Sequence, residues 1–200
     1  MKKLALLIAF LAVTITVSAQ QQKSFIEVTG VTAYKRTVEK YIVSVILSKD
    51  VLYNDELETY EGMKKKFLDK VKASQVAISK LREDEFLYLT TGYRKQGIVF
   101  VFETASKDEL IRFMRIKSLG ATMHNRNVVF KQTDIAILSK KAIENARQNA
   151  EKIAKNTGQS VGEIIALVDD NTIEIKEAIY DDNTESEIYY KLGVRFELLK

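Results

Sequence analysis

The chain has 200 residues, 46% of them hydrophobic and 29% charged, with no cysteine and no proline. This composition suits one folded domain with a real core, and the lack of cysteine excludes disulfides, thiolate metal sites, a cysteine nucleophile and a lipid-accepting cysteine. The formal net charge is +4, and without Lys2 and Lys3 it falls to +2 (29 basic and 27 acidic residues). This near-balance argues against a nucleic-acid-binding protein, because such proteins usually carry a clear basic excess.

Residues 1–19 have the pattern of a secretory signal peptide. Lys2 and Lys3 form a positive n-region, residues 4–17 form an apolar core, and residues 17–19 form a small-residue cleavage site. The apolar run of about 14 residues is shorter than the roughly 20 that a spanning helix needs. A retained anchor is the alternative interpretation.

We therefore expect a mature chain that starts at Gln20 and folds as a single domain over residues 20–200. Its expected location is the periplasm, after secretion through the Sec pathway. No later segment is long and apolar enough to cross a bilayer, so we expect no transmembrane span in the mature chain.

The first half of the mature chain predicts strands on both sides of a long helix. Residues 24–30 predict a short strand ending in a turn, and residues 37–48 a longer strand with one apolar and one mixed face. A helix is expected over residues 55–81, with a bent or broken helix as the alternative, because Gly62 weakens its middle by about 1 kcal/mol relative to alanine. Strands are then expected at 86–91 and 96–104, the second covered on both faces.

The second half opens with a short helix and leads to a long one. Ser106 and Glu109 have capping-box spacing, and the helix that they begin is expected to end near Gly120. A strand follows at 127–132. The helix predicted over residues 135–158 has alanine at every fourth position, namely Ala142, Ala146, Ala150 and Ala154. That narrow stripe predicts close packing on a sheet, with Gly158 as the C′ residue.

The C-terminal region predicts mainly strands. Residues 162–169 and 172–180 are expected strands, and residues 181–187 an acidic loop. Residues 188–198 alternate strictly between apolar and polar, which is typical of a sheet with one buried and one wet face. Helices and strands mix without regular βαβ repetition. We therefore predict an α+β fold, with a mixed, largely antiparallel sheet and helices packed on one face.

These segments together resemble the SIMPL-domain family of exported bacterial proteins, which includes periplasmic immunogenic proteins. The similarity lies in an I-x-V-x-G start at 26–30, a strand and polar cap at 127–134, the alanine run from 142 to 158 leading into 161–164, and the final strand at 194–198. The chain departs from the family at residues 31–40, which lack its Gly-rich turn and Pro-Asp pair. The resemblance implies a SIMPL-like fold, a role in the cell envelope and stress tolerance, self-assembly in some members, and no agreed reaction.

Candidate catalytic and metal-binding residues are few. His124, the only histidine, lacks a motif that would place a nucleophile and an orienting carboxylate beside it, and we interpret it as a turn or surface residue. Five acids could bind a hard cation such as calcium, but their spacing fits no EF-hand, and we interpret them as solvated loop residues: Asp169, Asp170, Asp181, Asp182 and Glu185. We therefore name no catalytic, cofactor-binding or metal-binding residue, and we expect no cofactor.

Two further features bear on binding. The lysines at 64–66, with Lys70 and Lys72, are interpreted as a solvated helix face, with contact to an anionic lipid or glycan as the alternative. Tyr189 and Tyr190 must face opposite ways on a strand, so one of them leaves the core face and is available to an interface or a ligand.

The favoured function is that of an exported, non-enzymatic SIMPL-domain protein of the cell envelope, linked to stress tolerance. It would act through self-association, as a homo-oligomer, or through contacts with an envelope partner, and not with nucleic acid. The alternative is a periplasmic binding module for a small ligand or peptide. A hydrolase using His124 is the third hypothesis.

Overall fold

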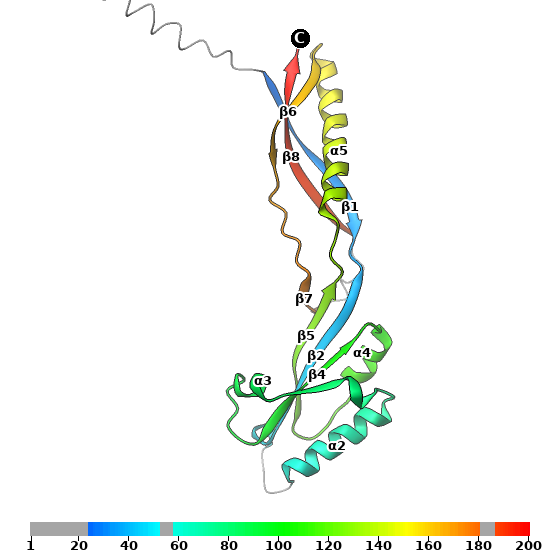
Figure 1. Ribbon diagram of the computed structural model, residues 1–200, viewed down its shortest axis with the longest axis vertical. Helices are drawn as coiled ribbons and strands as arrows, with labels where there is room; N and C mark the ends of the chain where they lie inside the picture. Colours follow the sequence, from blue (N-terminus) through cyan, green and yellow to red (C-terminus); the bar gives the residue numbers. More distant parts are fainter. Residues whose placement is uncertain (1–23, 53–57, 181–186) are drawn as a thin grey trace, which may run out of the picture. The chain divides into compact units, whose positions relative to one another are not determined.

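The computed structural model describes residues 24–52, 58–180 and 187–200 (Figure 1). The predicted signal peptide at residues 1–19 lies outside this part of the chain. The elements follow in the order β1 (Phe25–Lys35), β2 (Val38–Ser48), η1 (Lys49–Val51), α2 (Tyr60–Ala73), η3 (Ile78–Lys80), β3 (Leu81–Asp84), α3 (Glu85–Leu89), β4 (Gly97–Thr104), α4 (Lys107–Met114), β5 (Ala121–Phe130), α5 (Ile135–Asn156), β6 (Ser160–Val168), β7 (Lys176–Ala178) and β8 (Glu187–Leu199).

The predicted α+β class is confirmed, with the strands divided between two sheets of order β1-β8-β6 and β3-β4-β2-β5-β7. The β2–β4, β2–β5, β3–β4, β5–β7 and β6–β8 pairings are antiparallel. The described residues form two compact units. Unit 1 takes residues 24–32, 135–171 and 189–200, and unit 2 takes residues 33–134 and 172–188 apart from the gaps given above. The extent of a single domain over residues 20–200 stays a prediction.

Unit 1 is built on helix α5, whose alanine stripe is buried as predicted. The four stripe alanines are at most 2% exposed. Close approach is visible at Gly30 of β1, where a Cβ would lie 1.9 Å from the carbonyl oxygen of Ala142. The side chain of Asn145 accepts a hydrogen bond from the Val31 amide at 3.0 Å. The helix backbone therefore lies directly against strand β1, which only small residues permit.

The end of α5 also follows the prediction. Gly158 has a φ of +68°. The Gln159 amide donates to the carbonyl of Ala154 at 3.0 Å, and the Gly158 amide donates to that of Lys155 at 3.2 Å. These two bonds form a Schellman motif, which satisfies carbonyls that the helix leaves unpaired.

Strand β8 shows the predicted alternation. Tyr190, Leu192, Val194 and Phe196 are buried, and the residues between them are half-buried or exposed. The Tyr190 hydroxyl donates to the carboxylate of Asp169 at the end of β6. Tyr190 therefore lies in the core, whereas Tyr189 is 53% exposed, as the alternation predicts.

Unit 2 buries both faces of its central strands. One face of β2 and β4 packs against α2 and α4 in a core that includes Val43, Phe67, Phe100 and Phe113. The other face carries a smaller cluster of Ile46, Val99 and Val101 of the two strands with Tyr88 of α3. The predicted burial of β4 on both faces is confirmed.

Two predictions in unit 2 are wrong. The continuous helix predicted over residues 55–81 is broken in the described part into α2 and the short η3, because Thr59 caps the start of α2 at the Gly62 amide and the chain takes a positive φ of 61° at Gln75. The start predicted near residue 55 lies outside the described residues. The strand predicted at 86–91 is helix α3, because the carboxylate of Asp84 caps its start by accepting from the Leu87 amide.

Several boundaries also differ from the prediction. Strand β1 continues through Gly30 to Lys35, and β5 begins at Ala121, so His124 lies within a strand and not at a junction. Helix α4 begins at the predicted cap, Ser106, but ends at Met114. Of the strand predicted at 172–180, only β7 forms. The predicted acidic loop falls almost wholly outside the described residues.

A basic pocket as candidate functional site

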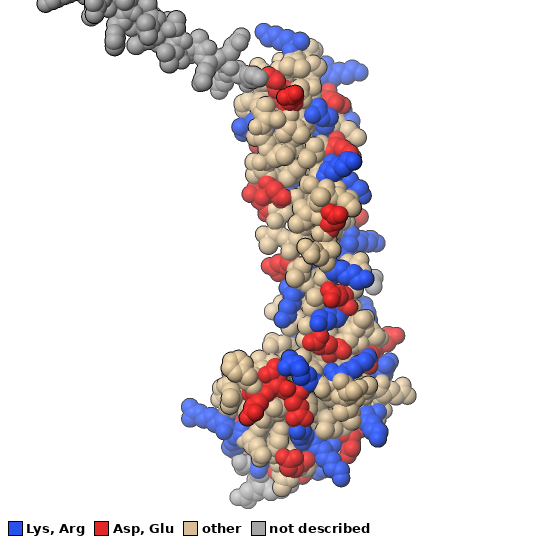
Figure 2. Space-filling model, viewed as in Figure 1, with Lys and Arg blue, Asp and Glu red and all other residues tan. Residues whose placement is uncertain are grey.

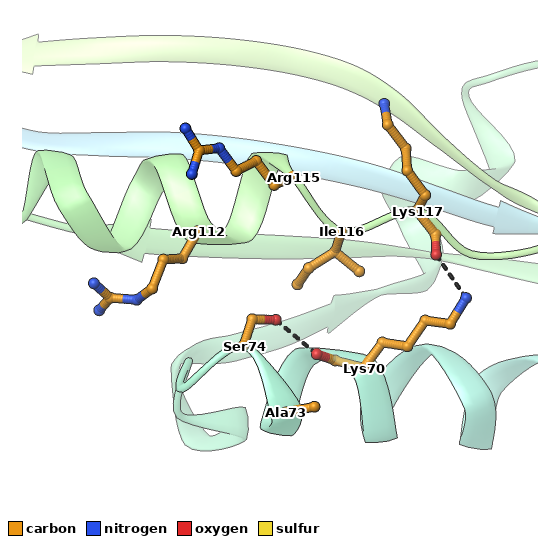
Figure 3. Close-up of a pocket in the computed structure, with 7 residues that line it drawn as sticks. All are labelled: Lys70, Ala73, Ser74, Arg112, Arg115, Ile116 and Lys117. Atoms are coloured by element: carbon orange, nitrogen blue, oxygen red, sulfur yellow. Dashed lines mark hydrogen bonds between the residues drawn. The ribbon is translucent and has the colours of Figure 1, made fainter.

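A pocket of about 340 Å³ lies in unit 2 between the end of α2 and the end of α4. Figure 3 shows the seven residues that line it: Lys70, Ala73, Ser74, Arg112, Arg115, Ile116 and Lys117. Four of the seven are cationic and none is acidic. The volume is at the small end of the range for ligand sites, which is about 300–1,000 Å³.

The buried faces of α2 and α4 determine which of their residues reach the pocket. Phe67 and Val71 turn one face of α2 into the core, which leaves Lys70 on its exposed flank. Leu110 and Phe113 do the same for α4, and the chain after that helix brings Ile116 and Lys117 to the pocket. Because helix C-termini carry partial negative charge, cations here also suit the helix ends, an effect of about 0.3–1 kcal/mol each.

Two hydrogen bonds connect the lining residues. The Lys70 ammonium donates to the carbonyl of Lys117 at 2.7 Å, which ties the α2 wall to the segment after α4. The Ser74 hydroxyl donates to the carbonyl of Lys70 at 2.6 Å (Figure 3). The hydroxyl proton of Ser74 is therefore used within the protein, and its lone pairs are left for another donor.

The arginines of the pocket are not neutralised by ion pairs in the described part of the chain. Figure 3 shows the guanidinium groups of Arg112 and Arg115 directed away from the ammonium of Lys70, so the cations do not meet at one point. The Nε of Arg112 is buried and has no hydrogen-bond partner among the described residues. A buried donor left unpaired costs about 1–3 kcal/mol.

The one buried carboxylate of α4 is engaged elsewhere. Glu109, one turn before Arg112, accepts hydrogen bonds from Lys80 at 2.6 Å and from Thr104 at 2.5 Å. Burial pushes the pKa of Glu109 up, but these bonds and the charges of Lys80 and Arg112 outweigh it, so the pKa lies below its usual value. Glu109 is thus ionised at neutral pH and is held by Lys80 and Thr104, so within the described ranges it gives the guanidinium of Arg112 no direct carboxylate partner.

The candidate residues from the sequence that the structure describes do not assemble into another site. His124 is exposed on β5. Asp169 and Asp170 are exposed, and the pKa of Asp169 is held below its ordinary value by hydrogen bonds from Tyr190 and Asn171. Asp181, Asp182 and Glu185 lie outside the described residues. Among the residues that are described, no group of three His, Cys, Asp or Glu side chains could hold a metal ion.

The lysines at 64–66, 70 and 72 differ in their surroundings. Lys64 pairs with Glu83 at 2.7 Å, and Lys66 pairs with Glu58. Lys65 and Lys72 are exposed on α2 away from the pocket, whereas Lys70 lines it. Figure 2 shows basic and acidic side chains interspersed over the face that it displays, so the acid-free pocket lining is a local departure from a mixed surface.

Of the residues that line the pocket, only Lys70 stands out in the sequence. The arginines of the pocket stand in the short run R-x-x-R-x-K from Arg112 to Lys117, at the end of a predicted helix. That run is the signal that could have drawn attention to the segment. Nothing local in the sequence brings it to Lys70 and Ser74, which lie about forty residues earlier.

Comparisons with known proteins give no match: no protein-family model fits the chain, and no curated protein is significantly similar to it. The resemblance to the SIMPL-domain family therefore stays a prediction. Across the described residues, none of the helices combines the length and apolarity required to cross a membrane.

Proposed function

We propose that this is an exported, non-enzymatic protein of the bacterial cell envelope that works by binding, and that the basic pocket holds an anionic ligand. Periplasmic location, a link to stress tolerance and SIMPL-domain membership are parts of this proposal that rest on the sequence pattern. The choice of a binding module, and of an anion, rests on the pocket in unit 2.

The observation that carries the proposal is the charge of the pocket lining. Four cations and no acid surround a space of about 340 Å³. Stabilising a helix end explains single cations there, but it does not require four cations and no acid around one space. An oxyanion supplies acceptors for such donors, and charge-assisted hydrogen bonds are roughly twice as strong as neutral ones.

The test is isothermal titration of the mature chain with inorganic pyrophosphate at low ionic strength. The pocket variant is the double substitution Arg115→Gln/Lys117→Gln. The control is Lys65→Gln/Lys72→Gln, which removes the same charge from exposed positions outside the pocket. We expect affinity to fall at least about tenfold in the pocket variant and less than about twofold in the control, because only direct contacts lose hydrogen bonds.

Equal weakening in both variants would show general charge attraction and not a site. If neither pyrophosphate nor glucose 6-phosphate, inorganic phosphate or glucuronate binds to the wild-type chain, the proposal of an anion-binding pocket is wrong.

Self-association is a second candidate, and strand β1 favours it. In the described residues, β1 is an 11-residue strand at the edge of the β1-β8-β6 sheet, with β8 on one side only. Edge strands present unpaired backbone groups that pair readily with another chain. Size-exclusion chromatography with light scattering tests this function, and a strict monomer at high concentration would contradict it.

A further inference from the structure

The charge of the pocket favours a phosphate ester over a single carboxylate. Two of the four cations are arginines, whose planar forks match phosphate and carboxylate oxygens in pairs. A phosphomonoester carries a charge of about −1.5 to −2 at pH 7 and three acceptor oxygens. A carboxylate brings one charge and two oxygens. An acid-free lining with four cations is therefore neutralised better by the ester.

Ser74, the one uncharged polar residue of the lining, suits a different part of the ligand. Because the Ser74 hydroxyl donates to the carbonyl of Lys70, its oxygen offers only lone pairs to a ligand. Lone pairs repel an anion and accept from a hydroxyl. Ser74 thus fits a hydroxyl group of the ligand and does not fit its phosphate.

The size and the remaining walls limit the body of the ligand. Ala73 and Ile116 supply short apolar surfaces. A space of about 340 Å³ is at the lower limit for small-molecule sites, which suits one sugar-sized ring with its phosphate.

We propose that the pocket binds the phosphate ester of a small polyhydroxylated body, that is, a sugar phosphate or a phosphorylated sugar headgroup. Arg115 and Lys117, whose side chains are exposed, turn to the phosphate. Arg112 and Lys70 add positive charge around it, and Ser74 accepts from a ring hydroxyl. This inference rests on the proposed function, since it names the ligand class of the same pocket.

The experiment is isothermal titration of the mature chain at pH 7.5 with four probes: glucose 6-phosphate, inorganic phosphate, glucuronate and glucose. We expect glucose 6-phosphate to bind at least tenfold more tightly than glucuronate and at least threefold more tightly than inorganic phosphate. Glucose alone is expected to bind too weakly to measure. Arg115→Gln/Lys117→Gln removes binding of both phosphates, and Lys65→Gln/Lys72→Gln leaves it within about twofold.

Ser74 variants separate the hydroxyl contact from charge. Ser74→Ala is expected to weaken glucose 6-phosphate binding three- to tenfold and to leave inorganic phosphate unchanged, whereas Ser74→Thr restores the sugar phosphate. Circular dichroism checks that each variant is folded. The ligand class is wrong if glucuronate binds as tightly as glucose 6-phosphate, or if Ser74→Ala leaves the affinity for glucose 6-phosphate unchanged. In either case, anion binding that is lost in Arg115→Gln/Lys117→Gln still supports the proposed function. If no anion binds, both are wrong.

A vesicle measurement distinguishes a free sugar phosphate from a lipid headgroup. Co-sedimentation compares phosphatidylcholine vesicles with and without phosphatidylinositol 4-phosphate. Capture by the phosphorylated vesicles alone, lost in Arg115→Gln/Lys117→Gln, supports the proposal and assigns a lipid-borne ligand. Capture that survives in the pocket variant contradicts a headgroup site at the pocket.

Discussion

The two units pack their helices on sheets in opposite ways. In unit 1 helix α5 meets its sheet through alanines, and the backbone at Gly30 lies so close that it leaves no room for a methyl group. In unit 2 helices α2 and α4 meet theirs through aromatic side chains, with the rings of Phe102 and Phe113 4.4 Å apart. Small side chains bring the helix backbone close to the sheet, whereas large side chains hold the helix farther from it.

The basic pocket lies at the ends of the two helices of unit 2 that are packed through large residues. Long cationic side chains reach across such a space, because their stems cover apolar surface while their charged ends stay in water. Unit 1 offers α5 as a fixed scaffold, and unit 2 offers the candidate binding surface.

The largest expected effect is the loss of an aromatic ring from the core of unit 2. Phe102 is fully buried, so Phe102→Ala should destabilise the protein by about 4 kcal/mol through lost transfer energy and a cavity. Urea denaturation followed by circular dichroism measures it. Phe86→Ala removes the same ring from a position that is 79% exposed and should change stability by less than about 0.5 kcal/mol.

The next effect tests close packing in unit 1. Gly30→Ala places a Cβ 1.9 Å from the carbonyl oxygen of Ala142, and the backbone must move to relieve it, at a cost of about 3 kcal/mol. Gly193→Ala in β8 is the matched control, because its nearest atom would lie at an ordinary 3.4 Å. Denaturation should show no loss for the control, and equal losses in the two variants would refute the packing argument.

A smaller effect concerns the hydrogen bond from Tyr190 to Asp169. Burial, and then Asp169, raise the pKa of Tyr190 to about 12, and the pKa of Asp169 is lowered in turn, first by Tyr190. Tyr190→Phe should cost about 1 kcal/mol at pH 7, since Asp169 is exposed and its bond is screened by water.

The pH dependence of that effect has a definite sign. A carboxyl group with a lowered folded pKa contributes stability above its ordinary value of 3.8 and loses it as pH falls through the folded pKa. The gap between wild type and Tyr190→Phe should therefore shrink below about pH 4. Tyr180→Phe, at a residue 86% exposed, should show no gap at any pH, and a gap that grows in acid would contradict the assignment.

The smallest effect separates a binding role from a structural one. If the cations of the pocket serve a ligand, Arg115→Gln/Lys117→Gln should reduce stability by less than about 0.5 kcal/mol while abolishing anion binding. Thermal denaturation without ligand measures the first part. A loss above about 1 kcal/mol would indicate that these cations mainly stabilise helix ends.

The features that the sequence predicts correctly are those determined by residues close together in the chain. The stripe from Ala142 to Ala154, the turn at Gly158 and the alternation along β8 are each set by residues close in the chain, and all three are confirmed. Helix α3 was missed because its aromatic and aliphatic residues have high strand propensity, and the cap from Asp84 decides the conformation.

The pocket could not be predicted from the sequence, because its residues come together only in the tertiary structure. Lys70 lies in α2 and Ser74 is its C-cap, whereas the run from Arg112 to Lys117 comes from α4 and the segment after it. Only the shared core around Phe67 and Phe113 brings those helix ends together. A composition close to neutral also concealed the cluster, because acids elsewhere on the surface balance it.

The most direct measurement of the central claim is a two-dimensional amide NMR titration of the mature chain with glucose 6-phosphate. The account predicts shifts concentrated at residues 70–74 and 112–117, absent when glucose is the titrant and abolished by Arg115→Gln/Lys117→Gln. Shifts centred on other residues, or no shifts with the sugar phosphate, would contradict it.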